Sequence, residues 1–237
     1  MGKNLTVFFT GLFLALGIAA AGGAVCYGLI AGKQANRTVS VRGLAEREVD
    51  ADLAVWPLKF TVAADDLTSL NEAVKRDSAI VEAYLAKNNV GKADIVKQSI
   101  NVDDEAQRMY ANSTPRPYRY IGEVTFLIRS VNIEAVKAAD RNLRDLIAQG
   151  VLLSNNYGAS QAQFLFNGLN DIKPDMIAEA TVNARAAADQ FAKDSGSRVG
   201  RIKTATQGLF SITDVNEAMP EKKIVRVVNT VEYFLTD

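Results

Sequence analysis

The stretch 52-DLAVWPLKFTV-62 decides the fold, because apolar residues occupy every second position in it. Successive side chains of a strand point to opposite faces of a sheet, so one face of this stretch is entirely apolar. That face comprises Ala54, Trp56, Leu58, Phe60 and Val62, whereas the opposite face carries Lys59 and Thr61. The pattern predicts a strand with one buried face and with Trp56 in the core. Pro57 cannot donate a ladder hydrogen bond, so we expect a sheet edge or a bulge there.

Alternating strands and helices surround this stretch. Residues 38–42 have the two-residue period of a strand, which Gly43 is expected to end. Ser69 and Glu72 form a capping-box pattern, which predicts that a helix begins there and continues to residue 87. Two further strands are expected at residues 95–102 and 118–129, joined by a polar loop.

The second half of the chain continues in the same manner. Asn132 is expected to cap a helix that ends before Gly150, and the longest soluble helix is expected to begin near Pro174. Short strands are expected at 151–153 and 161–167, and longer ones at 202–212 and 223–235. Because the strands arrive in hairpin-like pairs, we predict an α+β fold of mainly antiparallel sheets with helices packed on one side.

The longest predicted helix has a face built mainly of alanine. Its members are Ala180, Ala184, Ala187, Ala188, Phe191 and Ala192. Small side chains let a helix approach a sheet or another helix closely, so this face predicts close packing.

An uncharged, apolar run at positions 5–30 reads LTVFFTGLFLALGIAAAGGAVCYGLI. As a helix it would extend about 39 Å, enough to cross a hydrocarbon core of about 30 Å. We therefore expect a transmembrane anchor over residues 1–31, a linker over residues 32–37 and a soluble domain over residues 38–237. A cleaved signal peptide is the alternative, because the small residues at 19–24 offer a cleavage site. Val25 precedes Cys26 where a lipoprotein signal requires a small residue, which argues against lipidation.

The orientation of the anchor rests on two opposing signals. Basic residues follow the span, and the positive-inside rule alone would place the soluble domain in the cytoplasm. Acidic residues share that region, and a short tail bearing Lys3 before an apolar run is how export signals begin. We expect a single-pass protein of the inner membrane whose soluble domain lies in the periplasm.

Composition excludes several classes of function. Lys plus Arg and Asp plus Glu are equal at 27 each, so no nucleic-acid partner is expected. The chain has no histidine, which excludes Ser-His-Asp and Cys-His triads. The acidic runs 65–66 and 103–105 are expected at the ends of elements and lack the spaced ligands and glycine of an EF-hand loop. We predict no catalytic residue, no metal site and no cofactor.

One segment interleaves cations with aromatic residues and is the candidate for binding a ligand or a partner. Its candidate residues are Arg108, Tyr110, Arg116, Tyr118, Arg119 and Tyr120. The alternative is that the tyrosines bury their rings locally at the entry to the following strand.

Several of these segments together resemble the SIMPL-domain family, which includes bacterial periplasmic immunogenic proteins and a protein linked to oxidative-stress defence. The matching features are 39-VSVRG-43 with the strand after it, 120-YIG-122, the alanine-rich helix at 179–194 with 200-GRI-202, and the valine-rich strand at 225–235. The resemblance covers most of residues 38–235. It implies an α+β domain, export to the envelope and self-association into ring-like or barrel-like oligomers, and it implies no catalytic residues.

The expected function is therefore that of a non-enzymatic, membrane-tethered envelope protein that self-assembles into a ring-like or barrel-like homo-oligomer, in the context of envelope or oxidative-stress protection. Its expected partners are other copies of itself and, through residues 5–30, the lipid bilayer. The alternative is a periplasmic module that binds a small ligand or a peptide through the Arg/Tyr-rich segment at 108–120.

Overall fold

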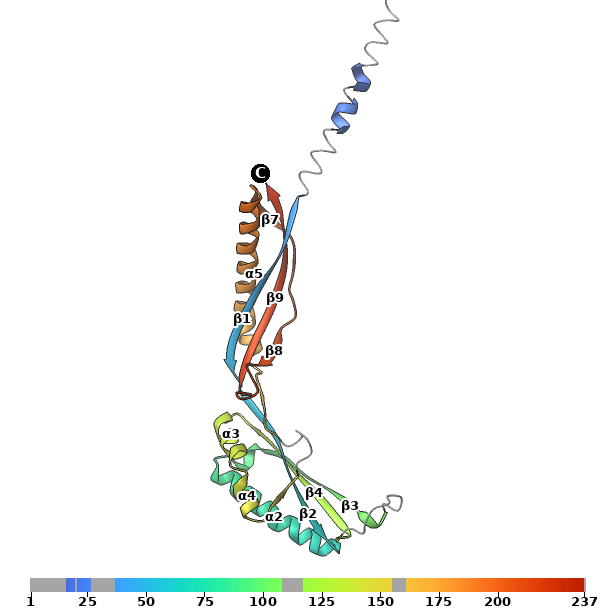
Figure 1. The fold of residues 1–237 in the computed structure, drawn as a ribbon, viewed down its shortest axis with the longest axis vertical. Helices are drawn as coiled ribbons and strands as arrows, with labels where there is room; N and C mark the ends of the chain where they lie inside the picture. Colours follow the sequence, from blue (N-terminus) through green and yellow to red (C-terminus); the bar gives the residue numbers. More distant parts are fainter. Residues whose placement is uncertain (1–15, 20, 27–36, 108–116, 155–160, 237) are drawn as a thin grey trace, which may run out of the picture. The chain divides into compact units, whose positions relative to one another are not determined.

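A computed structural model describes residues 16–19, 21–26, 37–107, 117–154 and 161–236 (Figure 1). The chain forms two compact units. Of the described residues, those within 16–46, 173–211 and 226–236 belong to the first unit, and those within 47–172 and 212–225 belong to the second. The α+β class and the antiparallel sheets predicted from the sequence are confirmed.

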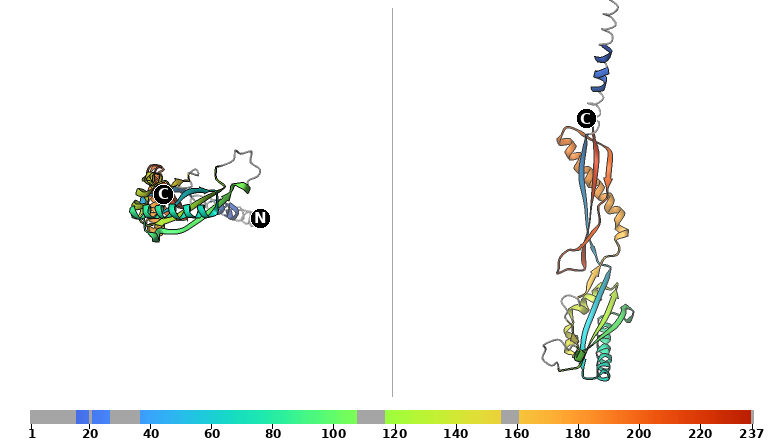
Figure 2. Two further views of the ribbon diagram at one scale, coloured as in Figure 1. Left: turned by 90° about the horizontal axis from the view of Figure 1, so that it is seen from below. Right: turned by 90° about the vertical axis from the view of Figure 1, so that its right-hand side faces the viewer.

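The first unit is a sheet covered by one long helix. Strand β9 (Lys222–Thr236) lies between β1 (Thr38–Asp50) and β7 (Arg198–Thr206), and β8 (Ser211–Asp214) also pairs with β9. Helix α5 (Leu169–Asp194) runs along the strands (Figures 1 and 2). Every fourth residue of α5 is buried, which gives the stripe Met176, Ala180, Ala184, Ala188 and Ala192. The predicted close packing of the alanine face is therefore confirmed, except that Phe191 points away and is exposed.

Gly43 explains why α5 needs small residues. The sequence predicted that this glycine ends the first strand, but β1 continues through it to Asp50, and Gly43 is buried. A Cβ atom added to Gly43 would lie 1.8 Å from the carbonyl oxygen of Ala180 and 2.4 Å from the backbone nitrogen of Ala184. The backbones of β1 and α5 are thus in direct contact, a contact that only glycine permits.

A buried polar residue also joins β9 to α5. The Nδ2 atom of Asn229 donates to the carbonyl oxygen of Ile177 and to the hydroxyl oxygen of Thr181, both at 3.2 Å. Buried amides are costly unless they are hydrogen-bonded, so these two contacts fix the position of β9 along the helix.

The second unit is a five-stranded antiparallel sheet. Its order is β3 (Ile95–Asp104), β4 (Tyr120–Ser130), β2 (Leu53–Ala64) and β5 (Leu152–Leu153), and β6 (Gln163–Leu165) also pairs with β2. The helices are α2 (Leu67–Lys87), α3 (Ile133–Arg141) and α4 (Arg144–Ala148), with short 3-10 turns at Lys92–Asp94 and Glu105–Gln107.

One face of this sheet and all three helices form the core of the second unit. Trp56 and Phe60 of β2, Phe126 of β4, Tyr84 of α2 and Leu146 of α4 belong to a single buried cluster. The helices lie on the same side of the strands (Figure 1). The prediction that Trp56 is a core residue is confirmed.

Pro57 lies at a point where β2 has no strand partner on one side among the residues that the structure describes. It pairs with Leu127 of β4, but on its other side β6 pairs only with residues 53–55 and β5 only with residues 60–61. The proline therefore stands in the gap between two short strands, where no amide donor is needed.

Several predicted boundaries were wrong, and the strand expected at 202–212 is two strands, β7 and β8. Helix α2 begins earlier because Asp66, not Ser69, caps it and accepts hydrogen bonds from the backbone of Thr68 and Ser69. The side-chain contact with Ser69 contributes most to lowering the pKa of Asp66, and the backbone contacts add to it. Strand β3 extends through Asp103 and Asp104, which were expected in a loop, because it pairs with β4 to its end. Helix α5 begins at Leu169 and contains Pro174.

Most of the predicted anchor over residues 5–30 lies outside the described residues. Residues 16–19 and 21–26 are described, and both segments are helical. Among the described residues, no helix combines the length and the hydropathy needed to cross a bilayer.

Candidate interaction site

The Arg/Tyr-rich segment is described only at its C-terminal end. Arg108, Tyr110 and Arg116 lie outside the described residues. Tyr118 is exposed, Arg119 follows it, and Tyr120 begins β4 with its ring half-buried against the core cluster.

Arg119 forms a small cluster with Tyr120 and with Asp104 at the end of β3. Its guanidinium lies 4.9 Å from the centre of the Tyr120 ring and 3.3 Å from the carboxylate of Asp104. The hydrogen bond to Asp104, together with its negative charge, raises the pKa of Arg119. Asp104 was not predicted as the partner of Arg119, because it was expected in a loop after the strand; the register of β3 with β4 brings the two residues together. The cluster holds the base of this segment in place and leaves Tyr118 accessible.

Strand β3 lies at one edge of the sheet. Among the described residues it pairs with β4 alone, and its residues 96–102 are all exposed. Among these residues are Ile100 and Val102, which are apolar and exposed by 47% and 41%. An edge strand presents unpaired amide and carbonyl groups that can pair with another chain.

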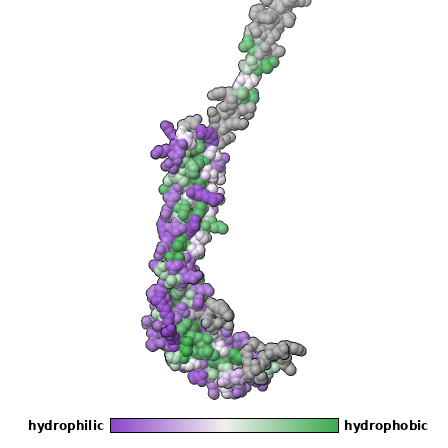
Figure 3. Space-filling model, viewed as in Figure 1, coloured by the Kyte–Doolittle hydropathy of each residue, from purple (hydrophilic) through white to green (hydrophobic). Residues whose placement is uncertain are grey.

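The sheet also has one face that no helix covers within the described part of the chain. It is formed by the alternate positions of β2 and β4 that point away from the core, and from Val55 onward those of β2, like those of β4, are half-buried or exposed. Val55, Pro57, Ile121 and Leu127 lie on it together with the ion pair between Lys59 and Glu123. In the space-filling view, hydrophobic residues gather over the part of the second unit that holds β2 and β4 (Figure 3).

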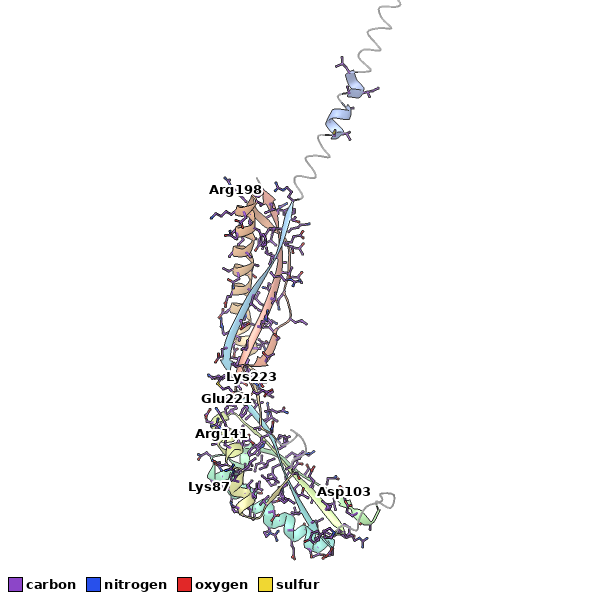
Figure 4. All side chains as sticks on the ribbon, in the orientation of Figure 1. Lys87, Asp103, Arg141, Arg198, Glu221 and Lys223 are labelled. Carbon is purple, nitrogen blue, oxygen red and sulfur yellow. The ribbon has the colours of Figure 1, made fainter. Side chains whose placement is uncertain are left out.

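A polar cluster lies at α3, on the other side of the second unit from Asp103 (Figure 4). Lys137 of α3 is paired with Glu221, and both side chains are largely buried. Burial acts to raise the pKa of Glu221, but the hydrogen bond from Lys137 and the charges of Lys137 and Arg141 outweigh it, so the pKa is lowered. This pair was not predicted, because its members are 84 positions apart in the chain.

Next to this cluster is a cavity of about 750 Å³. Asp140 lines it, and burial raises the pKa of that carboxyl group. Lys223, paired with Asp214, contributes to another part of the lining. Within the described residues, no group of three or more His, Cys, Asp or Glu side chains could hold a metal ion.

The Lys137–Glu221 pair gives a testable pH dependence. A Lys137→Met variant leaves Glu221 buried without its cation, so we expect a loss of about 2 kcal/mol of unfolding free energy at pH 7. The pKa of Glu221 in the folded state is lowered from its ordinary value of 4.5. The pair therefore stabilises the fold fully above pH 4.5, and this contribution is lost as the pH falls through the folded-state pKa. The loss measured by urea unfolding should therefore shrink below pH 4.5.

The matched control is Lys92→Met, which removes an exposed ion pair with Glu82. Exposed pairs contribute less than about 1 kcal/mol. Equal losses in the two variants, or a loss from Lys137→Met that does not change with pH, would contradict the assignment.

The fold and this surface define an α+β protein with two antiparallel sheets, one of which has a face that no helix of the described part of the chain covers. The family model of SIMPL, described as a protein of unknown function (DUF541), matches residues 39–229. The chain belongs to this family.

Comparison with individual proteins adds little. No curated protein matches the chain. Among solved structures, a hydrolase from Listeria innocua is similar at 11% identity, with 81% of this chain and 91% of that chain covered and a TM-score of 0.23. A likeness at that score supports no statement about activity.

Proposed function

We propose that this protein is a non-enzymatic scaffold of the bacterial envelope, held at the inner membrane by residues 5–30, with its soluble part in the periplasm. It self-associates through its second unit into a ring-like or barrel-like homo-oligomer that protects the envelope, including under oxidative stress. Tethering assists this assembly, because confinement to a membrane raises the effective concentration of the domains and lets weak contacts suffice.

The observation that carries the proposal is the incomplete cover of the sheet in the second unit. Its helices bury one face, whereas the other face and the β3 edge present apolar side chains to solvent. Contiguous exposed apolar surface commonly marks an interaction site. A second copy of the chain is the partner that the family resemblance favours.

Light scattering on the detergent-solubilised full-length protein tests this proposal. We expect a mass that is a multiple of the monomer and that falls on dilution. Leu152→Asp, which introduces a charge at an exposed position of β5, should reduce the assembled fraction about tenfold, because burying an unpaired charge at an interface is costly. The control is Leu209→Asp, at an exposed position of the first unit. A monomeric mass at every concentration would rule out the proposal.

A binding module is the second candidate, favoured by the exposed Tyr118 beside the fixed Arg119–Tyr120 cluster. Exposed aromatic and arginine side chains are frequent anchors in recognition. This candidate predicts that Tyr118→Ala and Arg119→Ala leave the assembled mass unchanged but abolish retention of soluble envelope peptides by the immobilised protein.

A further inference from the structure

We propose that two copies of the chain join through β3, whose strands pair in antiparallel orientation about a two-fold axis at Ile100. In this arrangement Lys97 of each copy faces Asp103 of the other. The inference rests on the proposed self-association and specifies one contact of it. Three observations support it: the direction in which the backbone groups of β3 point, the order of its charges and the exposure of its apolar residues.

The hydrogen-bond pattern determines which residues of β3 can pair outward. The amide of Glu105 donates to the carbonyl oxygen of Arg119 at 2.9 Å, in the same register that pairs Asp103 with Ile121 and Lys97 with Leu127. In an antiparallel ladder, residues that bond to one neighbour alternate with residues whose backbone groups point to the other side. The odd-numbered residues of β3 therefore bond to β4, and the even-numbered ones face outward.

An added antiparallel strand must place outward-facing residues opposite one another. With the axis at Ile100, Ile100 faces its own copy and Gln98 faces Val102 of the second copy, so all the hydrogen-bonding pairs are even-numbered. Lys97 and Asp103 then form pairs without hydrogen bonds, in which side chains approach most closely. Moving the axis by one residue, to Ser99 or Asn101, places Lys97 opposite Asn101 or opposite a position beyond the end of β3.

The charges of β3 favour self-pairing in this register, whereas the charges of many natural edge strands prevent self-pairing. Natural edge strands often carry a lysine because pairing with an identical strand would bring like charges together. Here the lysine stands three residues before the axis and the aspartate three residues after it, so self-pairing brings opposite charges together twice. The irregular pairing of β3 with β4 is confined to residues 95–97, at the edge of the proposed contact.

The apolar residues of β3 supply the second reason for pairing. Val102 pairs with Gly122, and a Cβ atom added to Gly122 would lie 3.5 Å from the side chain of Ile100 and 3.6 Å from that of Leu70 in α2. Both Ile100 and Val102 therefore lie on the helix side of the sheet. They are nevertheless exposed by 47% and 41%. A second copy, with its own helices on the same side, would cover both.

Cysteine cross-linking tests the register directly. In a Cys26→Ser background, Ile100→Cys places two thiols opposite each other with Cα atoms about 5.5 Å apart, within the range of a disulfide. The control is Val96→Cys, also exposed and on the same strand. Its two copies would lie roughly 27 Å apart and should not cross-link. A mixture of Gln98→Cys and Val102→Cys proteins should cross-link, whereas neither alone should.

Charge reversal tests the ion pairs. Lys97→Asp or Asp103→Lys should lower the cross-linked fraction at position 100 about tenfold, because each brings like charges together twice. The variant that carries both changes should restore it. Failure of that restoration, or equal cross-linking at positions 96 and 100, would overturn the proposed register.

Light scattering on the same samples separates this inference from the proposed function. An assembled mass without cross-linking at position 100 refutes the β3 contact but leaves self-association intact. A monomeric mass refutes both. An assembled mass with cross-linking at position 100, and at the mixed 98 and 102 positions, supports both.

Discussion

The Gly43→Ala variant is expected to lose about 3 kcal/mol of unfolding free energy, the upper end of the usual cost of overpacking. The added methyl group would lie 1.8 Å from a carbonyl oxygen of α5 and 2.4 Å from a backbone nitrogen. Neither atom can move without shifting the helix, because both belong to its backbone. Relief requires α5 to move away from β1, which opens the packing of Ala180 and Ala184.

Two spectroscopic signals should separate the effects on the two units. Far-UV circular dichroism reports on both, whereas fluorescence reports on the second unit, because the one tryptophan of the chain is Trp56. We expect the dichroism melt of Gly43→Ala to gain a transition shifted down by roughly 12–24 °C, because the first unit is small.

Gly91→Ala is the control for this substitution. A Cβ atom at Gly91 meets its nearest neighbour at 3.5 Å, an ordinary contact. If the Gly43→Ala and Gly91→Ala proteins melted at the same temperature, α5 would not be in close contact with β1.

The contrast between Gly43 and the stretch at 52–62 shows which parts of the fold a sequence discloses. The period of two in that stretch is a local pattern, because each strand residue points to a face set by its position alone. The role of Gly43 depends on α5, which lies more than a hundred positions later in the chain. As an isolated glycine in a strand pattern it could be interpreted as a break, and only the position of the helix shows that it is a contact.

The candidate site follows the same distinction. Sequence analysis identified Arg119 and Tyr120 because alternation of cations and aromatic residues is a local feature. Asp104 was placed in a loop, since adjacent acidic residues usually end a strand, and its pairing with Arg119 depends on the register between β3 and β4. The free edge of β3 depends on the order of all strands in the sheet, which no local pattern specifies.

The second large effect is expected for Phe126→Ala, which should lose about 4 kcal/mol of unfolding free energy. Phe126 is 0% exposed and lies in β4 between positions of β2 and β3. Its ring centre is 6.0 Å from that of Phe60, so the substitution removes an aromatic contact and leaves a cavity in the middle of the sheet. Trp56 belongs to the same core cluster, and its fluorescence should report the loss in a urea titration.

The matched control for this change is Phe191→Ala, the same substitution at a position that is 62% exposed. It removes little buried surface and introduces a better helix former, so its effect should stay within about 0.5 kcal/mol.

The two variants also connect stability with assembly. Strand β4 holds β3 in place, so loosening β4 should weaken any contact made by the β3 edge. Phe126→Ala should therefore lower the assembled mass in light scattering, while Phe191→Ala should leave it unchanged. If both variants unfolded at the same urea concentration, the core of the second unit would have to lie elsewhere than at Phe126.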